Sequence, residues 1–256
     1  MKILASDYDG TLNVLGEVSE ENIEAIRAWR AAGNLFGLVS GRNLGSIKKF
    51  LDKDNVPYDF MVGCNGSVIT DAEGNATGHS CIPARVAKAL FEEFFKYEVD
   101  WVSASYDWGS VGVQASTDLR ADDTCLMLDE VRLDRVLQVS CWFTCPEQAL
   151  AVRDKCEAMF PGQIKGLMPT VQSIDFVCAG TDKASGIRKL STCRGLAPEV
   201  ILTVGDGEND VSMLDDADFS FCPGDAIVAD RYPNVCSCGK GAVADVIYKK
   251  IPEILK

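Results

Sequence analysis

Residues 2–12 read KILASDYDGTL, an apolar segment that runs directly into the acidic loop Asp7-Tyr8-Asp9-Gly10-Thr11-Leu12. Residues 2–6 have the length and composition of a buried strand. A loop with two aspartates is most often a solvated turn or a helix cap, so the loop alone does not define a site. Its meaning depends on the side chains that the rest of the chain places at the same edge of a sheet.

Strand and helix patterns alternate on both sides of a central insertion. Ser19 can cap a helix with acidic residues in its first turn, and apolar runs at residues 35–39 and 60–62 flank a second helical pattern. After the insertion a helix follows Lys183, and an apolar run at residues 200–204 ends in another acidic loop. Shorter patterns predict a helix at 211–214, a strand at 219–222 and a helix at 242–249. This alternation is typical of a parallel sheet covered on both faces.

Residues 82–180 follow a different pattern. A helix with one apolar face comes after Pro83, and a second helix near residues 147–159 stands apart from a run of strand patterns. The strand patterns lie at residues 99–103, 111–115, 136–143 and 171–178. We therefore predict an α/β fold with a doubly wound, Rossmann-like parallel-sheet core made of residues 1–81 and 181–256, interrupted by an inserted α+β domain at residues 82–180.

The composition is that of an ordinary globular protein with an acidic surface. The 256 residues include 47% hydrophobic and 25% charged residues, and the formal net charge is −13. A surface of this sign repels nucleic acid and anionic lipid, so we expect neither as a partner. No run approaches the roughly 20 apolar residues that span a bilayer, and Asp7 comes too early for a secretory signal. We expect a cytoplasmic protein, and the sequence does not indicate its oligomeric state.

The 11 cysteines and the single histidine limit the possible chemistry. An odd number of cysteines in a chain without a secretory signal is typical of reduced thiols that fill space. Cys236 and Cys238 are the closest pair, but no second pair or histidine lies at zinc-ligand spacing. His79 would have to carry any Ser-His-Asp or Cys-His mechanism alone, and its place beside Gly78 indicates a loop edge.

Polar groups gather where the predicted parallel strands end. The strand at 35–39 is followed by Ser40-Gly41-Arg42, and the strand at 200–204 by Gly205-Asp206-Gly207-Glu208-Asn209-Asp210. Lys183 begins the helix after the insertion. In doubly wound sheets, ligands bind beyond the carboxyl ends of the strands. Carboxylates, hydroxyls, one lysine and glycines suit a phosphate that is bound together with a hard cation such as Mg²⁺.

These segments resemble, in order along the chain, the four motifs of haloacid dehalogenase (HAD) superfamily phosphatases. Residues 7–12 (DYDGTL) are similar to the first motif, 39–42 (VSGR) to the second, 181–187 (TDKASGI) to the third and 205–210 (GDGEND) to the fourth. The Cof-type branch, which has a large inserted (type IIB) cap, also carries an Asn-Gly segment like Cys64-Asn65-Gly66-Ser67. Tyr8 stands where many members have an aliphatic residue. The inserted domain resembles the family's cap only in its length and in its order of strand and helix patterns.

The resemblance implies a Mg²⁺-dependent phosphatase that hydrolyses a small phosphorylated metabolite, expected to be a sugar phosphate, through an aspartyl-phosphate on Asp7. Asp7 would be the nucleophile, which needs no deprotonation at neutral pH. Asp9 would act first as general acid and then as general base, and we expect it to be partly shielded from water. The metal ligands would be the side chains of Asp7 and Asp206, the backbone carbonyl group of Asp9, and Asp210 acting through water.

The resemblance also assigns residues that would bind the phosphoryl group and the rest of the substrate. The phosphoryl oxygens would be held by Thr11, Ser40, Gly41, Lys183 and Asn209. Arg42 and Asn65 are the candidate residues of the core domain for substrate recognition. The inserted domain would act as a lid that excludes water. Its own candidates for contact with the substrate are Trp101, Trp108, Trp142, Arg120, Arg132 and Arg135.

Several other functions stay open at this point. A phosphomutase or phosphotransferase of the same fold would use the same nucleophile and hand the phosphoryl group to a sugar. A receiver-like signalling module also combines an aspartate, a hydroxyl and a lysine beside Mg²⁺, but receivers are much shorter and lack the insertion. An inactive phosphate-binding protein could share the fold. A dehalogenase is disfavoured because Asp9 supplies an acid that a carbon–halogen bond does not need.

Overall fold

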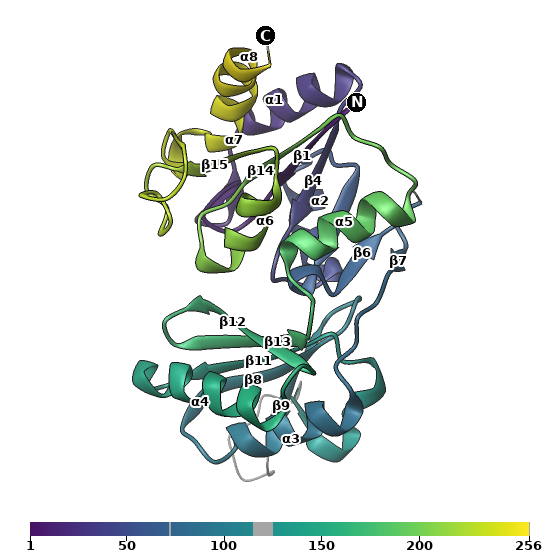
Figure 1. Cartoon of the computed structure of the whole chain (residues 1–256), viewed down its shortest axis with the longest axis vertical. Helices are drawn as coiled ribbons and strands as arrows, with labels where there is room; N and C mark the ends of the chain where they lie inside the picture. Colours follow the sequence, from purple (N-terminus) through teal and green to yellow (C-terminus); the bar gives the residue numbers. More distant parts are fainter. Residues whose placement is uncertain (72, 115–124, 256) are drawn as a thin grey trace. The chain divides into compact units, whose positions relative to one another are not determined.

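The computed structural model describes residues 1–71, 73–114 and 125–255, which form two compact units (Figure 1). The core unit consists of Met1–Gly78 and Asp182–Lys256, and the inserted unit consists of His79–Thr181. The insertion predicted from the sequence pattern covers residues 82–180. That the two units act as a catalytic core and a cap stays a prediction.

The core unit is built on an eight-stranded sheet with the strand order β16-β15-β14-β1-β4-β5-β6-β7. The neighbouring parallel strands are β16 (Asn234–Val235), β15 (Phe219–Pro223), β14 (Val200–Val204), β1 (Lys2–Ser6), β4 (Leu35–Val39) and β5 (Phe60–Gly63). At one edge β6 (Val68–Thr70) and β7 (Ala76–Thr77) continue the sheet in antiparallel fashion. The predicted α/β core with a parallel sheet is confirmed.

Strand β1 lies in the middle of this sheet because its side chains are apolar on both faces. Ile3, Leu4 and Ala5 are fully buried, and β1 pairs with β14 on one side and with β4 on the other. Parallel neighbours end at the same edge of a sheet, so strand pairing alone brings together the loops that follow β1, β4 and β14. The acidic loop after Ser6 therefore lies at the centre of that edge.

Helices cover both faces of the core sheet. Helix α1 (Glu20–Ala31) connects β1 to β4 and α2 (Leu44–Lys53) connects β4 to β5, whereas α6 (Val211–Asp216) connects β14 to β15 in the opposite direction along the sheet. Since such crossovers are right-handed, the two directions place their helices on opposite faces. Helix α5 (Lys183–Cys193) packs with α6, where Ile187 and Met213 share a buried cluster with β1. The first helix packs against α7 (Ala242–Asp245).

The helix ends follow the predicted signals with one difference. Ser19 caps α1, since its Oγ accepts a hydrogen bond from the Asn22 N–H at 3.3 Å. The helix predicted at residues 242–249 extends further, because α7 continues through a π-helical turn at Val246–Lys250 into α8 (Ile251–Ile254). Pro252 has no N–H to donate to the preceding turn, and the wider π-helical turn falls directly before it.

The short elements of the unit are the hairpin strands β2 (Asn13–Val14) and β3 (Glu17–Val18) and the turns η1 (Cys64–Gly66), η4 (Glu208–Asp210) and η5 (Cys238–Lys240).

The inserted unit contains a six-stranded sheet with the order β10-β9-β8-β11-β13-β12. The strands are β8 (Val99–Ser105), β9 (Ser110–Gln114), β10 (Cys125–Met127), β11 (Gln138–Phe143), β12 (Ile164–Thr170) and β13 (Ser173–Cys178). Strands β10 and β12 were not predicted from the sequence pattern. Gly166 and Pro169 interrupt the strand pattern of β12, and an edge strand tolerates them because one side of its backbone is unpaired. Residue 115, predicted as the end of β9, lies outside the described residues.

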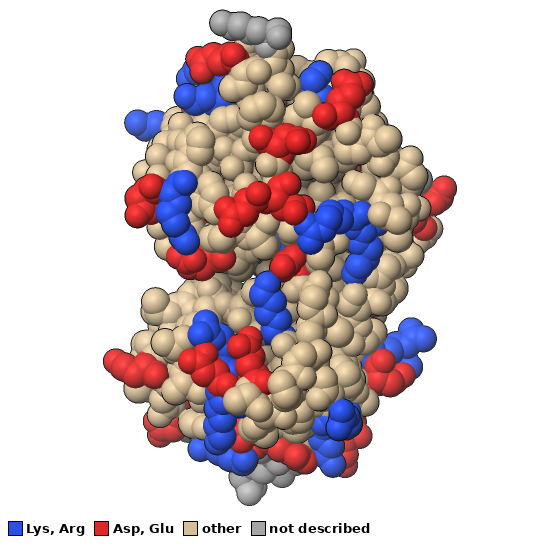
Figure 2. Space-filling model, viewed as in Figure 1, with Lys and Arg blue, Asp and Glu red and all other residues tan. Residues whose placement is uncertain are grey.

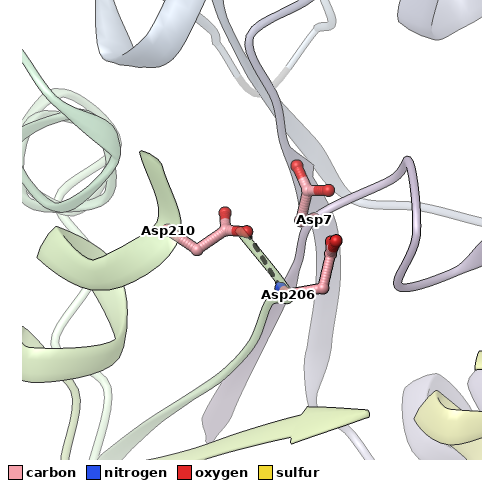
Figure 3. A group of neighbouring side chains, drawn as sticks. All are labelled: Asp7, Asp206 and Asp210. Carbon is pink, nitrogen blue, oxygen red and sulfur yellow. Dashed lines mark hydrogen bonds between the residues drawn. The ribbon is translucent and has the colours of Figure 1, made fainter. Parts of the chain in front are cut away.

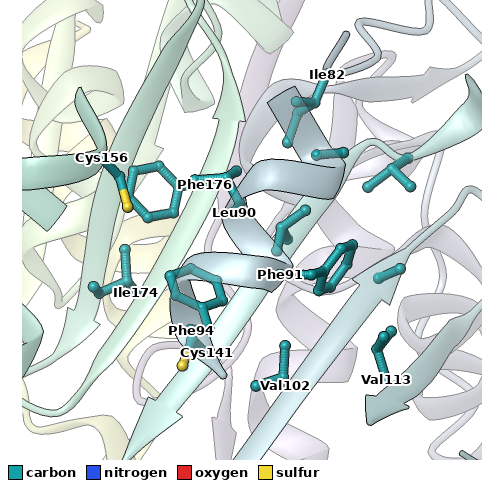
Figure 4. Packing of buried hydrophobic residues seen from close by; sticks show 14 of the residues in the cluster. Ile82, Leu90, Phe91, Phe94, Val102, Val113, Cys141, Cys156, Ile174 and Phe176 are labelled. Carbon is teal, nitrogen blue, oxygen red and sulfur yellow. The ribbon is translucent and has the colours of Figure 1, made fainter. Parts of the chain in front are cut away.

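Helices α3 (Ala84–Phe94) and α4 (Pro146–Met159) pack on one face of this sheet (Figure 4). The ring of Phe94 contacts the rings of Phe143 and Phe176, with centroid distances of 6.1 and 6.0 Å. Cys141 and Cys156 lie in the same cluster, where burial raises the pKa of both thiols. All 11 cysteines of the chain are free thiols, and those in this cluster fill apolar space.

One carboxylate, Glu93 of α3, is buried beside this cluster and paired with cations. Its side chain is 1% exposed, and its oxygens accept from Lys96 Nζ at 2.7 Å and Lys155 Nζ at 2.6 Å. The hydroxyl of Tyr97 donates a third hydrogen bond at 3.0 Å. Burial alone would raise the pKa of Glu93, but these three partners lower it to about 2. The ionised carboxylate thus joins α3 to α4.

Acidic and basic side chains are interspersed over the face of each unit shown in Figure 2. Among the described residues, no helix is both long enough and apolar enough to cross a membrane. Although the formal net charge is −13, many surface carboxylates have a cation nearby, as in the Lys48–Asp52 pair at 2.6 Å.

Replacing Glu93 by glutamine is expected to lower the free energy of unfolding at pH 7 by about 1–3 kcal/mol. The folded-state pKa, about 2, lies below the ordinary value of 4.5. The contribution of the ionised group is therefore complete above about pH 4.5 and is lost as the pH falls toward 2. Urea unfolding at pH 7 and pH 3 should show the difference between wild type and variant shrinking in acid.

Glu92→Gln is the matched control, because Glu92 is the preceding residue but its side chain is 55% exposed. That variant should differ from wild type by less than about 1 kcal/mol at either pH. Equal losses for the two variants would contradict the assigned role of Glu93.

Candidate active site

The side chains of three aspartates meet where strand β1 ends (Figure 3). Asp7 follows β1 and donates its backbone N–H to the carbonyl oxygen of Val204 at 2.9 Å, which holds it beside the end of β14. Asp206 and Asp210 lie in the loop that follows β14. One carboxylate oxygen from each of the three residues lies within 4.8 Å of the other two. The pairing of β1 with β14 therefore assembles an acidic cluster from two distant parts of the sequence.

Two glycines make room for this cluster. Gly10 has a φ of +77°, and a Cβ atom there would lie 2.5 Å from Asp206 Oδ2. A Cβ atom at Gly205 would lie 2.6 Å from the Cβ atom of Asp210. Any larger residue at either position would displace a carboxylate, so the geometry of the cluster requires both glycines.

Lys183 lies between two of the carboxylates. Its Nζ atom is 2.6 Å from Asp7 Oδ1 and also forms an ion pair with Asp210 Oδ1. The side chain of Lys183 is 1% exposed. Asp182 caps helix α5 by accepting the Ser185 N–H at 2.9 Å, which fixes Lys183 in the first turn of that helix. The lysine is therefore a fixed and buried part of the cluster.

Burial dominates the electrostatics of these groups. It raises the pKa of Asp7 well above its ordinary value, and the charges of Asp210 and Asp206 act in the same direction, while Lys183 opposes them. Burial, together with the charge of Asp210, raises the pKa of Asp206 to about 6. Burial works to lower the pKa of Lys183, but the carboxylates of Asp210 and Asp7 outweigh it and raise that pKa. One lysine thus faces three carboxylates, and the cluster is short of positive charge.

The cluster fits a hard divalent cation. Its donors are carboxylate oxygens, which Mg²⁺ prefers, and a cation would supply the missing positive charge. The carboxylates are already oriented by hydrogen bonds. Asp206 Oδ1 accepts from Thr11 Oγ1 at 2.8 Å, and Asp210 Oδ2 accepts the N–H groups of Asp206 and Gly207 at 3.0 and 2.9 Å. The predicted contribution of the Asp9 carbonyl group stays a prediction.

Three of the predicted phosphate-binding residues lie at the same edge of the sheet. Ser40 and Gly41 follow β4, the parallel neighbour of β1, and Thr11 lies in the loop after β1. Thr11 and Ser40 are buried, and both hydroxyls are engaged, Thr11 with Asp206 and Ser40 with the Arg42 N–H at 3.2 Å. The structure therefore groups these residues with the acidic cluster, while their role toward phosphate stays a prediction.

The surroundings of Asp9 differ from the prediction. Its side chain is 48% exposed, so the expected shielding from water is wrong. Both of its oxygens accept hydrogen bonds from the Arg42 guanidinium, from Nε at 2.6 Å and from Nη2 at 2.9 Å. The reason is that Asp9 lies on the outer part of its loop beside a cation, rather than among apolar side chains. Arg42, predicted to read the substrate, is engaged by Asp9 in this structure.

The residue that supports Arg42, Phe50, was not among the predicted site residues. The guanidinium carbon of Arg42 lies 4.9 Å from the centre of the Phe50 ring, and the same ring stacks on Tyr8 at a centroid distance of 5.6 Å. Helical spacing assigns Phe50 to the core-facing side of α2, which gives no sign of a contact with the loop after β1. Tyr8, the residue that departs from the family pattern, is 1% exposed and supplies the second ring.

Asn65, the other predicted substrate-reading residue, is fully buried. Its Oδ1 accepts a hydrogen bond from Asn209 Nδ2 at 3.3 Å, and its N–H donates to the Ser40 carbonyl oxygen at 3.0 Å. Asn65 therefore has no exposed surface to offer a substrate, and its contacts are with two predicted phosphate-binding residues. The geometry does not support a role in reading the substrate.

The candidates in the inserted unit are mostly exposed. Trp101, Trp108 and Trp142 are 47%, 66% and 41% exposed, and Trp101 pairs with Trp142 in the register of β8 and β11. Arg132 and Arg135 lie at the turn η3 (Leu133–Arg135). Arg120 lies outside the described residues. Contact of these residues with a substrate stays a prediction.

A family model described as haloacid dehalogenase-like hydrolase matches residues 4–229. The chain is 28% identical over 240 residues to a Streptococcus pyogenes protein named as a bifunctional phosphatase/peptidyl-prolyl cis-trans isomerase, covering 88% of this chain and 48% of that protein. It is 22% identical over 242 residues to the 5-amino-6-(5-phospho-D-ribitylamino)uracil phosphatase YcsE of Bacillus subtilis. That match covers 88% of this chain and 85% of that protein. A solved sugar phosphatase of HAD subclass IIB has the same fold, with a TM-score of 0.80 at 20% identity. The superposition covers 99% of this chain and 98% of that protein.

Replacing Lys183 by methionine is expected to lower the free energy of unfolding by about 3–5 kcal/mol in metal-free buffer, because Asp7 and Asp210 lose their buried counter-ion. Lys48→Met is the control, since Lys48 pairs with Asp52 on the surface, and it should cost less than about 1 kcal/mol. Urea unfolding measures both. A loss for Lys183→Met as small as that of the control would show that the buried pair does not hold the cluster together.

Proposed function

Because the chain belongs to the family of haloacid dehalogenase-like hydrolases, we propose that it is a Mg²⁺-dependent phosphatase whose nucleophile is Asp7. The family resemblance predicted from the four motifs is confirmed by the match over residues 4–229. The observation that carries the proposal is the buried ion pair of Lys183 with Asp7, at 2.6 Å, inside a cluster of three carboxylates. A carboxylate fixed by a lysine next to a cation site can attack a bound phosphate ester.

The reaction proceeds in two steps. In the first, a carboxylate oxygen of Asp7 bonds to phosphorus while the ester P–O bond breaks. Asp9, which must first leave its ion pair with Arg42 and take up a proton, gives that proton to the departing oxygen, so that the alcohol leaves and Asp7 carries the phosphoryl group. In the second, Asp9 takes a proton from water as the water oxygen bonds to phosphorus. The bond between phosphorus and Asp7 then breaks, which releases inorganic phosphate and restores the carboxylate.

The neighbouring residues hold the phosphoryl group and offset its charge. Lys183 faces both the nucleophile and Asp210, so its charge lies where negative charge develops. The donors to the phosphoryl oxygens are the hydroxyl of Ser40, the backbone N–H of Gly41 and the amide of Asn209. Thr11 joins them once its hydroxyl turns away from Asp206 Oδ1, to which it donates in this structure. Mg²⁺ would be held by the side chains of Asp7 and Asp206, by the Asp9 carbonyl group and, through water, by Asp210. It would offset the repulsion between the phosphate and these carboxylates.

The substrate proposed is a small phosphorylated metabolite, specifically a sugar phosphate. Two relatives support this class by their names, a sugar phosphatase and a phosphatase of a phosphoribityl compound. The chain spans 48% of the length of the streptococcal relative. The acidic surface, with a formal charge of −13, favours a small ester over nucleic acid.

Wild-type protein should release inorganic phosphate from one or more members of a panel of sugar phosphates and from p-nitrophenyl phosphate, and only when Mg²⁺ is present. Asp7→Asn should lower the rate by at least about 1,000-fold, because the amide is not a nucleophile. Asp52→Asn, a change of the same kind at an exposed ion pair, should keep the wild-type rate. Phosphate release at fixed enzyme concentration is the measurement.

Two outcomes would count against the proposal. Unchanged turnover by Asp7→Asn would remove Asp7 as the nucleophile. If every ester fails with the wild type while the phosphoryl group passes from one sugar to another, the chain is a phosphomutase or phosphotransferase.

A further inference from the structure

Three consecutive residues of the core unit have left-handed backbone conformations. The φ angles of Cys64, Asn65 and Gly66 are +49°, +51° and +99°. All three residues are buried. Residues other than glycine adopt this region at a cost of about 1 kcal/mol or more, and they do so where the surrounding structure imposes it. Such a turn without solvent exposure indicates that its shape serves the residues around it.

The turn is held against helix α5 by close backbone packing. A Cβ atom at Gly66 would collide with the carbonyl oxygen of Asp182, and one at Gly186 would lie 2.9 Å from the Cα atom of Gly66. Lys189 Nζ donates to the carbonyl oxygens of Gly66 at 3.2 Å and Gly78 at 2.9 Å. The turn is thus fixed to the helix that carries Lys183.

The other side of the turn contacts two of the loops that form the candidate active site. Cys64 donates its N–H to the carbonyl oxygen of Arg42 at 2.8 Å, and Asn65 donates its N–H to that of Ser40 at 3.0 Å. The Oδ1 atom of Asn65 accepts from Asn209 Nδ2 at 3.3 Å. The side chain of Asn65 therefore reaches the loop after β14, and its backbone fixes the loop after β4.

We propose that Asn65 is a positioning residue that orients the carboxamide of Asn209 toward the phosphoryl group. The inference rests on the proposed function, in which Asn209 binds a phosphoryl oxygen. A carboxamide nitrogen has two hydrogens. Asn65 takes one of them, which fixes the rotamer of Asn209 and directs the other hydrogen to the ligand without a loss of side-chain freedom on binding.

The residue type at position 65 fits this role. Asparagine tolerates the left-handed region better than other residues with a Cβ atom, and it also provides a neutral acceptor. Glycine would accept the backbone conformation but would provide no acceptor. Aspartate would place a negative charge beside Asn209, in the loop that already carries Asp206 and Asp210.

The test is Asn65→Gly, read out as the affinity for inorganic phosphate in Mg²⁺ buffer by calorimetry. Loss of the oriented hydrogen bond should weaken phosphate binding by about three- to tenfold. Asn55→Gly is the matched control, because Asn55 is also left-handed, with a φ of +52°, but is exposed after helix α2. This control makes the same chemical change at the same backbone conformation, and it should leave the affinity for phosphate unchanged.

A double-mutant cycle separates positioning from general loosening of the fold. In an Asn209→Ala background, Asn65→Gly should cause no further loss of phosphate affinity, because the side chain that it positions is gone. An equal loss in both backgrounds, or no loss in the wild-type background, would overturn the inference while wild type and Asn55→Gly still bind phosphate. If wild type itself binds no phosphate, the proposed function fails and the inference falls with it.

Discussion

The buried ion pairs of Lys183 with Asp7 and Asp210 are the interaction on which the rest of the core unit depends. They join the end of β1, the loop after β14 and the first turn of α5. Charges of this kind are stable away from water only when each has a partner and fixed geometry. The pairs therefore explain why three segments that are remote in sequence meet with so little freedom.

Much of the surrounding structure follows from that requirement. Gly10 and Gly205 leave space for the carboxylates, and the capping of α5 by Asp182 fixes the lysine. Backbone N–H groups of Asp206 and Gly207 orient the Asp210 carboxylate. Even so, one lysine faces three carboxylates, and burial together with the charge of Asp210 raises the pKa of Asp206 to about 6. A site in this state is prepared for a cation and an anionic ligand together.

The sequence was sufficient to predict the core sheet and the acidic cluster, since both follow from local patterns. Apolar runs of strand length gave β1, β4 and β14, and the pairing of parallel strands placed Asp7 and Asp206 at one edge. The edge strand β12 was not predictable from its pattern, because Gly166 and Pro169 interrupt it. The exposure of Asp9 and the burial of Asn65 were missed for a different reason. Each depends on a tertiary partner, Arg42 or Asn209, that no local pattern identifies.

The central claim of the mechanism is that a covalent bond forms between phosphorus and Asp7 during turnover. The most direct measurement is acid quenching of the enzyme during turnover, reduction of the acyl phosphate with borohydride, and mass spectrometry of the peptide that contains residue 7. Conversion of Asp7 to homoserine is expected only when substrate is present, with Asp9, Asp206 and Asp210 unchanged. Turnover without modification of Asp7, or modification of another residue instead, would contradict it.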